Sequence, residues 1–182
     1  DKNLPVIEKM IEKSFNAPLS SGCGRLFDAV SAILGLCLEN HYEGQAAIEL
    51  GEIVLAGTAA ELLRPYPYEI EAGIIKPGEM LAGIIRDRAA CTPVEIISTR
   101  FHKTLVKIIF EAVQEISLLT GLKKVALSGG TWQNPYLFRS VKNILTANGY
   151  QPLYHHQVPA NDGGIALGQV MIAHWRWLKK CV

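Results

Sequence analysis

The last third of the chain constrains the fold most, because it repeats one pattern twice. The segment KKVALSGG (123–130) is a short apolar run that ends in two glycines, and a helical segment follows it as far as Gly149. A second run, YQPLYH (150–155), leads through the turn NDGG (161–164) into a closing helix. Short apolar runs of this kind are typical of buried parallel strands, and strand–turn–helix units are typical of α/β folds. We therefore predict an α/β part over residues 122–182, with ligands bound at the loops after its strands.

The preceding residues, 1–121, are predicted to be mostly helical. Apolar residues at helical spacing mark a buried stripe made of Leu26, Phe27, Val30, Ile33, Leu34 and Cys37. Prolines and alternating residues over 62–76 indicate a short extended, hairpin-like excursion. The expected helices cover residues 4–15, a segment capped by Ser20 or Ser21, residues 45–56, a segment opened by Pro77, and a long segment from Pro93 to Gly121.

Composition excludes several classes of protein. The 182 residues suit one domain, or one lobe of a larger one. No apolar run approaches the ~20 residues that a membrane span needs, and the N-terminus lacks the layout of a signal peptide. The net charge is +1, with acids and bases interspersed, which argues against a nucleic-acid surface. We expect a soluble, cytoplasmic protein without a membrane or nucleic-acid partner.

The cysteines and histidines do not form a metal motif. Cys23, Cys37, Cys91 and Cys181 are far apart and include no C-x-x-C pair, so we expect reduced, mostly packed thiols. His155 and His156 are adjacent on a strand end, where neighbouring side chains point in opposite directions, so an ordinary loop is expected. His102 and His174 fall in the middle of helices and are expected at the edge of the core or on the surface.

The segment LSGGTWQN (127–134) places Gly129 and Gly130 between a strand and a helix. Backbone N–H groups at such a turn can bind phosphate, although a simple tight turn needs the same residues. The segment is neither a Walker A motif nor a G-x-G-x-x-G motif. Asn134 is expected either to cap the following helix or to reach a ligand with its amide.

Three further positions have two readings each. Asp28, which heads a row of small residues, is either a first-turn carboxylate favoured by the helix dipole or an acceptor for ribose hydroxyls. Gly44 and Gln45 form a turn that could also lie beside a ligand. Asp162 either caps the closing helix or contacts a ligand, with Gly163 and Gly164 clearing space.

Five segments in order closely resemble one family. They are SSGCGRLFDAVSAILGL, YEGQAAIEL, RFHKTLV, LSGGTWQN and VPANDGGIALGQ, and they resemble the C-terminal domain of the hydrogenase maturation carbamoyltransferases, the HypF family. The resemblance runs from about Leu19 to Gln169. It implies an actin-like ATPase lobe, of the sugar kinase and Hsp70 type, with extra helices. The threonylcarbamoyl-adenosine transferases of the TsaD group share this fold and weaker forms of three of the motifs.

The resemblance also implies an activity and a site. HypF proteins use carbamoyl phosphate and ATP to make a carbamoyl-adenylate, and the carbamoyl group passes to the C-terminal cysteine of the partner protein HypE. There it becomes the cyanide ligand of a NiFe hydrogenase. Asp162 matches an aspartate that holds a divalent metal, iron or zinc, together with two histidines of an H-x-x-x-H motif. The positions that match nucleotide-binding residues are Asp28, Gly44, Gln45, Gly129, Gly130 and Asn134.

The sequence departs from the family pattern, because it contains no H-x-x-x-H motif. We therefore expect the C-terminal lobe of a two-lobe domain without the upstream HypF domains, with weak or no metal binding and no catalysis by the chain alone. An apolar surface left exposed on such a lobe would favour self-association. Two alternatives remain: a TsaD-type transferase acting on tRNA, and a catalytically inert nucleotide-binding or interaction lobe.

Overall fold

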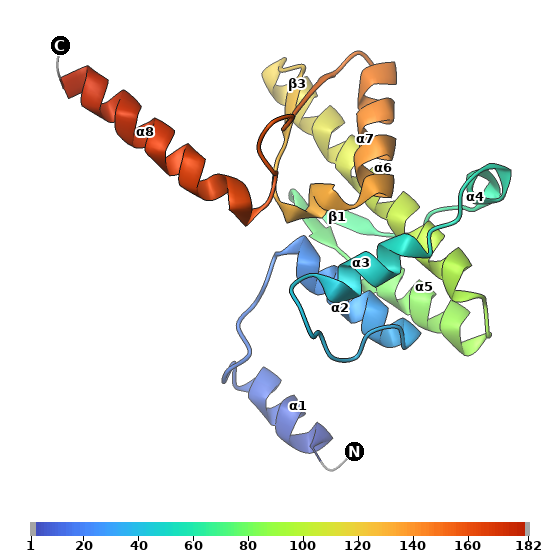
Figure 1. The fold of residues 1–182 in the computed structure, drawn as a ribbon. Helices are drawn as coiled ribbons and strands as arrows, with labels where there is room; N and C mark the ends of the chain where they lie inside the picture. The colour runs from blue at the N-terminus through green and yellow to red at the C-terminus, as the bar shows by residue number, and fades with distance from the viewer. Residues whose placement is uncertain (1–2, 181–182) are drawn as a thin grey trace.

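A computed structural model describes residues 3–180 of the chain, and Cys181 lies outside the described residues. The order of helices and strands follows the predicted order, apart from a short helix, α4 (Thr58–Leu62), that was not predicted (Figure 1). The elements are α1 (Leu4–Glu12), α2 (Cys23–Leu34), α3 (Gln45–Glu52), α4 (Thr58–Leu62), β1 (Glu69–Glu71), β2 (Ile74–Lys76), α5 (Gly78–Ala89), α6 (Val94–Thr120), β3 (Lys124–Leu127), the 3₁₀ turn η1 (Gly130–Gln133), α7 (Pro135–Ala147), β4 (Gln151–Tyr154), the 3₁₀ turn η2 (Asp162–Gly164) and α8 (Ile165–Lys180).

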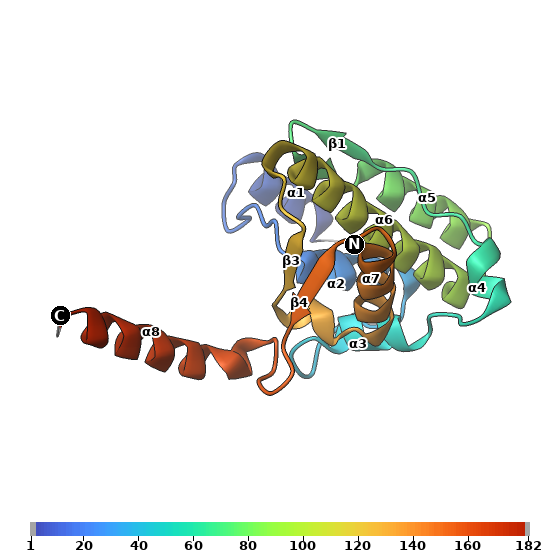
Figure 2. The ribbon, with the colours of Figure 1, turned by 90° about the horizontal axis from the view of Figure 1, so that it is seen from above.

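A helical body forms around α6, against which α3, α5 and α7 pack (Figures 1 and 2). Its core contains fully buried side chains from several helices, and each such side chain stabilises the fold by roughly 1.5–3 kcal/mol. The predicted stripe on α2 is mostly confirmed, since Phe27, Val30 and Leu34 are buried, whereas Leu26 and Ile33 are half-buried. The main core residues are Phe27, Val30, Leu34, Leu50, Tyr66, Met80, Ile84, Ile97, Phe101, Leu105, Ile108 and Leu137.

The α/β part is a two-stranded parallel sheet with α7 packed on it, as predicted. The register pairs Lys124 with Gln151 and Leu127 with Tyr154, so both strands end at the same edge. A second core cluster of Leu127, Val141, Leu145 and Tyr150 fills the space between this sheet and α7. The loops after the two strands therefore lie side by side.

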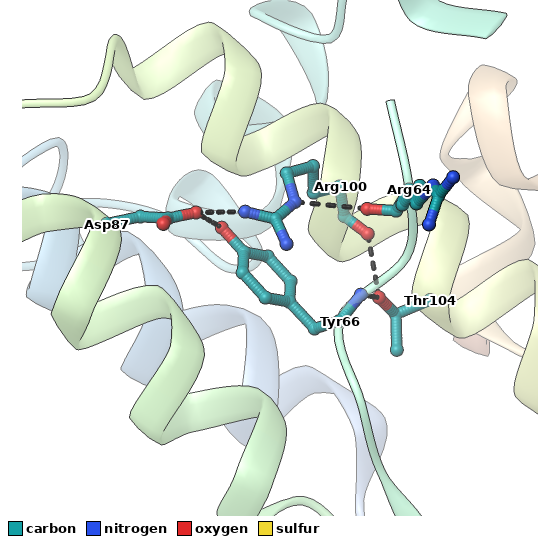
Figure 3. A network of polar contacts seen from close by, with 5 residues as sticks. All are labelled: Arg64, Tyr66, Asp87, Arg100 and Thr104. Atoms are coloured by element: carbon teal, nitrogen blue, oxygen red, sulfur yellow. Dashed lines mark hydrogen bonds and ion pairs between the residues drawn. The ribbon is translucent and has the colours of Figure 1, made fainter. Parts of the chain in front are cut away.

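The predicted extended excursion is a hairpin, in which β1 and β2 pair in antiparallel order. The segment that leads into it is fixed to α6. Arg100 of α6 donates to the carbonyl of Arg64 and lies over the Tyr66 ring, and the Thr104 hydroxyl accepts from the Tyr66 N–H (Figure 3). Asp87 of α5 completes the cluster by pairing with Arg100 and accepting from the Tyr66 hydroxyl.

Two helix boundaries differ from the predicted ones. Gly22 is the N-cap of α2, and the Ser20 hydroxyl accepts from the Gly22 N–H, so neither Ser20 nor Ser21 is the cap. Helix α3 ends at Glu52 rather than near residue 56. Beyond it, the Leu55 N–H donates to the Thr99 hydroxyl, which gives that segment a tertiary partner in place of a helical one.

The first and last helices leave the body. Helix α8 leads away from it in both ribbon views, and α1 is joined to it by an extended segment (Figures 1 and 2). Large apolar side chains are exposed along α8, namely Ile165, Leu167, Val170, Met171, Ile172, Trp175, Trp177 and Leu178. Self-association through this surface stays a prediction. Among the described residues, no helix is long and apolar enough to cross a membrane.

Candidate functional site

A cleft of about 1290 Å³ lies between the helical body and the loops that follow the two parallel strands. Five residues predicted from the sequence to form the site line this cleft: Asp28, Gly44, Gly130, Asn134 and Asp162. They come from positions spread over more than a hundred residues of the chain. The fold therefore brings the separate motifs to one place. Gln45 and Gly129 are not among the lining residues.

Asp28 lies in the second turn of α2, so the prediction of a first-turn carboxylate is wrong. Its side chain is 22% exposed and forms an ion pair of 2.7 Å between its Oδ2 atom and the Arg25 guanidinium. Apart from that ion pair, Oδ2 has no hydrogen-bond partner within the described chain, and neither has the buried Ser31 hydroxyl one turn further on. The carboxylate is thus able to accept additional hydrogen bonds from a ligand.

Gly44 and Gln45 have different roles. Gly44 is the N-cap of α3 with a φ of +79°, a conformation that glycine adopts without strain, and it lines the cleft. The Gln45 side chain accepts from the His41 N–H and donates to Glu49. These contacts hold the turn before α3 in place, which accounts for Gln45 without a ligand.

Gly129 and Gly130 also differ. Gly129 has a φ of +103°, and its N–H donates to the Ala160 carbonyl over 2.8 Å. That N–H joins the two strand-end loops and is therefore engaged within the protein. Gly130 begins η1 and lines the cleft. The Gly129 N–H is therefore not free to bind a phosphate, so the turn has one backbone donor fewer for a phosphate than predicted.

Asn134 caps α7 and also reaches into the core. Its Oδ1 accepts from the Leu137 N–H over 3.0 Å, which confirms the predicted cap. Its Nδ2 lies 2.9 Å from Nε2 of His102. Asn134 is half-buried and lines the cleft, so its carboxamide connects the cleft with α6.

His102 is fully buried, so the prediction of a position at the core edge or surface is wrong for it, while His174 is exposed as predicted. The Nδ1 atom of His102 lies 2.8 Å from the Ser98 carbonyl oxygen. Burial lowers the pKa of His102 to about 4, so the ring is neutral. A neutral ring that donates from Nδ1 must accept at Nε2.

Asp162 is exposed at the start of η2, and it does not act as the cap. The cap is Asn161, whose Oδ1 accepts from the Gly163 N–H over 3.1 Å. The glycines make room for the loop itself, because a Cβ on Gly164 would lie 2.7 Å from the Pro159 carbonyl oxygen. The Asp162 carboxylate is left available at the edge of the cleft.

The residues present do not fit a complete iron or zinc site. Within residues 3–180, no group of three or more His, Cys, Asp or Glu side chains is placed to hold a metal ion. His155 shares a hydrogen bond of 3.0 Å with Ser128, and the His156 ring lies against the Tyr154 ring at a tilt of 38°, as suits ordinary loop residues. Asp162 can supply one carboxylate ligand, which is too few for a protein metal site.

The cysteines show no disulfide among the described residues. Cys37 is buried and Cys23 is half-buried, where burial raises the pKa of its thiol. Cys91 is exposed, so the described thiols are mostly, but not all, packed, as expected. A raised pKa keeps the Cys23 thiol protonated, and a thiol is a poorer nucleophile than a thiolate.

Sequence reasoning missed part of the cleft. Gly51 of α3 and the basic residues Lys103 and Arg139 line it, and acidic lining residues outnumber basic ones. Lys103 belongs to the motif RFHKTLV, so this motif could have pointed to it. In the structure, the side chains of Arg100, Lys103 and Thr104 in this motif each form a hydrogen bond with residues 60–66. Gly51 carried no signal, because its role depends on a contact with Asn134 that is distant in sequence.

Comparisons with known proteins agree with this architecture. Residues 1–169 match the family model of the carbamoyltransferase Kae1-like domain, second subdomain. The carbamoyltransferase HypF of Synechocystis is 36% identical over 160 residues, which cover 85% of this chain and 20% of that protein. HypF of Rhodobacter capsulatus is also 36% identical, over 91% of this chain and 21% of that protein.

Solved structures give the same result. A crystal structure of full-length HypF in a phosphate- and nucleotide-bound form is 37% identical with a TM-score of 0.88, covering 95% of this chain and 27% of that one. HypF of T. kodakarensis, at 22% identity and a TM-score of 0.83 over 98% of this chain and 23% of that one, shares the fold. The chain spans about a fifth of the length of the curated HypF relatives above. It has an α/β fold and belongs to the HypF carbamoyltransferase family, in which it corresponds to the second subdomain of the Kae1-like domain.

Proposed function

We propose that the cleft binds the nucleotide part of a carbamoyl-adenylate, and that this chain is the nucleotide-holding lobe of an actin-like carbamoyltransferase domain. The observation that carries the proposal is the convergence of Asp28, Gly44, Gly130, Asn134 and Asp162 on one cleft. A relative at 37% identity whose structure is described as nucleotide-bound supports it.

Each lining group has a role that suits a nucleotide. The Asp28 carboxylate accepts hydrogen bonds from the ribose hydroxyls, a charge-assisted contact that is stronger than a neutral one. The turns at Gly44 and Gly130 allow close approach of the ligand to the backbone. The Asn134 amide, at the start of α7, donates a hydrogen bond to an acceptor atom of the ligand.

The proposed reaction is a transfer of the carbamoyl group to a thiolate. The C-terminal cysteine of a HypE-like partner attacks the carbamoyl carbon, a C–S bond forms, and the bond from that carbon to the phosphate oxygen breaks. AMP leaves with the electron pair, and the thiol proton passes to solvent. The carbamoyl-adenylate comes from carbamoyl phosphate and ATP in domains outside this chain, and the product leads to the cyanide ligand of a NiFe hydrogenase.

A divalent metal, iron or zinc, would take one ligand from Asp162 and the others from outside this chain. Because residues 3–180 supply so few ligands, we expect the isolated chain to bind such a metal weakly and to be inactive. A tRNA substrate fits less well, since the net charge is +1 with acids and bases interspersed, whereas a nucleic-acid surface usually gathers basic residues into one patch.

Isothermal calorimetry with ATP, with and without Mg²⁺ or Zn²⁺, tests the proposal. We expect the chain to bind ATP and Asp28→Ala to bind it about tenfold more weakly, as loss of a hydrogen bond to a charged group implies. Asp162→Ala should abolish any tightening by the metal. Glu115→Ala removes an exposed carboxylate outside the cleft and should change nothing. Equal binding by all four proteins, or no binding by any, would contradict a nucleotide site and leave an inert lobe.

A further inference from the structure

We infer that His102 is a positioning residue, which fixes the carboxamide of Asn134 so that the cleft is offered a hydrogen-bond donor at this point. The inference rests on the proposed nucleotide site and names the residue that orients one of the side chains lining it. His102 itself does not line the cleft, so it acts through Asn134.

The orientation of the His102 ring follows from its contacts. Phe27, Phe101 and Tyr136 present their rings at 72–83° to it, with centroids 5.4–5.7 Å away. Such edge-on packing on several sides of a fully buried ring leaves no room for rotation. Nδ1 is engaged by the Ser98 carbonyl at 2.8 Å, and the Ser98 hydroxyl in turn donates to the Leu50 carbonyl at 2.6 Å.

The ring then decides which way the Asn134 amide faces. Nε2 of the neutral ring is an acceptor, so only the Asn134 NH₂ group can satisfy it, at 2.9 Å. The carboxamide oxygen is thereby turned to the Leu137 N–H, which it caps at 3.0 Å. A flipped amide would place an oxygen against Nε2 and an NH₂ group against a backbone N–H, and both contacts would be repulsive.

One Asn134 hydrogen remains after these two bonds. Nδ2 carries two hydrogens, and among the described residues it has one partner, His102. Because Asn134 lines the cleft, the second hydrogen is available to an acceptor atom of the ligand, such as a phosphate, hydroxyl or ring-nitrogen acceptor. Asn134 thus selects for an acceptor at this point of the ligand.

Gly51 supplies independent support. A Cβ on Gly51 would lie 2.8 Å from Nδ2 of Asn134 and 4.0 Å from Nε2 of His102. The backbone of α3 therefore approaches this amide so closely that a Cβ at position 51 would force the amide to move. The amide is held between α3 and α6 in a place built for it.

Two substitutions of His102 separate positioning from a structural role. Glutamine keeps an acceptor near the position of Nε2, whereas asparagine is shorter and keeps a donor near the position of Nδ1. In calorimetric titrations with ATP, we expect His102→Asn to weaken binding by up to about tenfold, as much as Asn134→Ala does. His102→Gln should recover most of that loss. The double variant His102→Asn/Asn134→Ala should bind no more weakly than Asn134→Ala alone.

Other outcomes overturn the inference. Equal losses in His102→Asn and His102→Gln, or losses that multiply in the double variant, would show that His102 does not act through Asn134. Leu145→Ala, in the second core cluster outside the cleft, lowers stability and should leave ATP affinity unchanged.

A second measurement needs no ligand, so it separates this inference from the proposed function. In NMR spectra of the wild-type chain, we expect a scalar coupling across the hydrogen bond between Asn134 Nδ2 and His102 Nε2, and slow exchange of one Asn134 NH₂ hydrogen. Both should be lost in His102→Asn. If the chain does not bind ATP, the proposed function fails for it, and this spectrum still decides the positioning. Absence of the coupling and of the protected hydrogen in the wild type would overturn the inference.

Discussion

The carboxamide of Asn134 donates to the imidazole of His102 over 2.9 Å, and this bond joins the start of α7 to the first third of α6. Asn134 belongs to the loop after the first parallel strand, whereas His102 is surrounded by the helical core. The bond therefore connects the two parts of the fold at the wall of the cleft between them.

Replacing Gly51 with alanine should displace this pair. The added Cβ would lie 2.8 Å from Asn134 Nδ2, closer than packed atoms allow, so the amide must move. We expect Gly51→Ala to lower ATP affinity in calorimetry and to lower the free energy of unfolding by about 1–3 kcal/mol. Gly168→Ala is the matched control, because nothing lies within 4 Å of its Cβ and alanine favours a helix by up to about 1 kcal/mol. Unchanged ATP affinity in Gly51→Ala would contradict this account of the wall.

The buried His102 should make stability depend on pH. Burial lowers its pKa to about 4, against 6.5 for an exposed histidine. Between those values the unfolded chain binds a proton that the folded chain does not, so stability present above pH 6.5 is lost as the pH falls. The expected slope is about 1.4 kcal/mol per pH unit, on the order of 3 kcal/mol in total.

Denaturant unfolding of the wild type and His102→Gln from pH 4 to pH 7.5 measures this slope. The difference between the two proteins removes the contribution of the other titrating groups. A difference in stability that stays constant with pH would show that His102 does not titrate as a buried neutral ring.

The cluster at Asp87 should contribute more to stability than an exposed ion pair. Asp87 and Arg100 have side chains 24% and 25% exposed, and Asp87 also accepts from the Tyr66 hydroxyl, whose pKa is raised by burial (Figure 3). Asp87→Ala leaves both donors without this partner, which we expect to cost about 2 kcal/mol of unfolding free energy. Glu71→Ala breaks the exposed pair with Lys76 and should cost less than about 0.5 kcal/mol. If thermal denaturation shows equal losses of stability in Asp87→Ala and Glu71→Ala, the cluster at Asp87 does not stabilise the fold more than an exposed ion pair does.

Gly164→Ala should disturb the loop that presents Asp162. Its Cβ would lie 2.7 Å from the Pro159 carbonyl oxygen, and a backbone atom cannot rotate away as a side chain can. We expect the free energy of unfolding to fall by roughly 1–3 kcal/mol and the backbone NMR signals from Val158 to Asp162 to shift. Unshifted signals would mean that the loop has room for a side chain at this position.

The helical periodicity and the glycine punctuation were sufficient to predict most of the fold. Apolar spacing located α2 and α6, Pro77 located the start of α5, and the glycine-ended apolar runs located β3 and β4 with α7 between them. The end of α3 could not be predicted, because the segment after it is held by Thr99, a partner more than forty residues away. Local propensity carries no information about such contacts.

Only part of the site could be predicted, because the contacts of its residues also depend on segments that are distant in the sequence. The resemblance to the HypF family implied that Asp28, Asn134 and Asp162 belong to one site, and the structure places them on one cleft. Their local partners could not be derived from single motifs. Asn161 rather than Asp162 is the cap, and His102 is buried because three aromatic rings from distant segments enclose it.

A titration of the ¹⁵N-labelled chain with ATP and Mg²⁺, followed by two-dimensional NMR, tests the central claim most directly. If the cleft binds the nucleotide, the backbone signals of Gly44, Gly130, Asn134 and Asp162 shift together and saturate at one ATP concentration. Those of Ile75 and Lys76 in the hairpin, which do not line the cleft, stay in place. Signals that stay unshifted throughout the cleft, or shifts that are as large in the hairpin, would contradict a nucleotide site between the two parts of the fold.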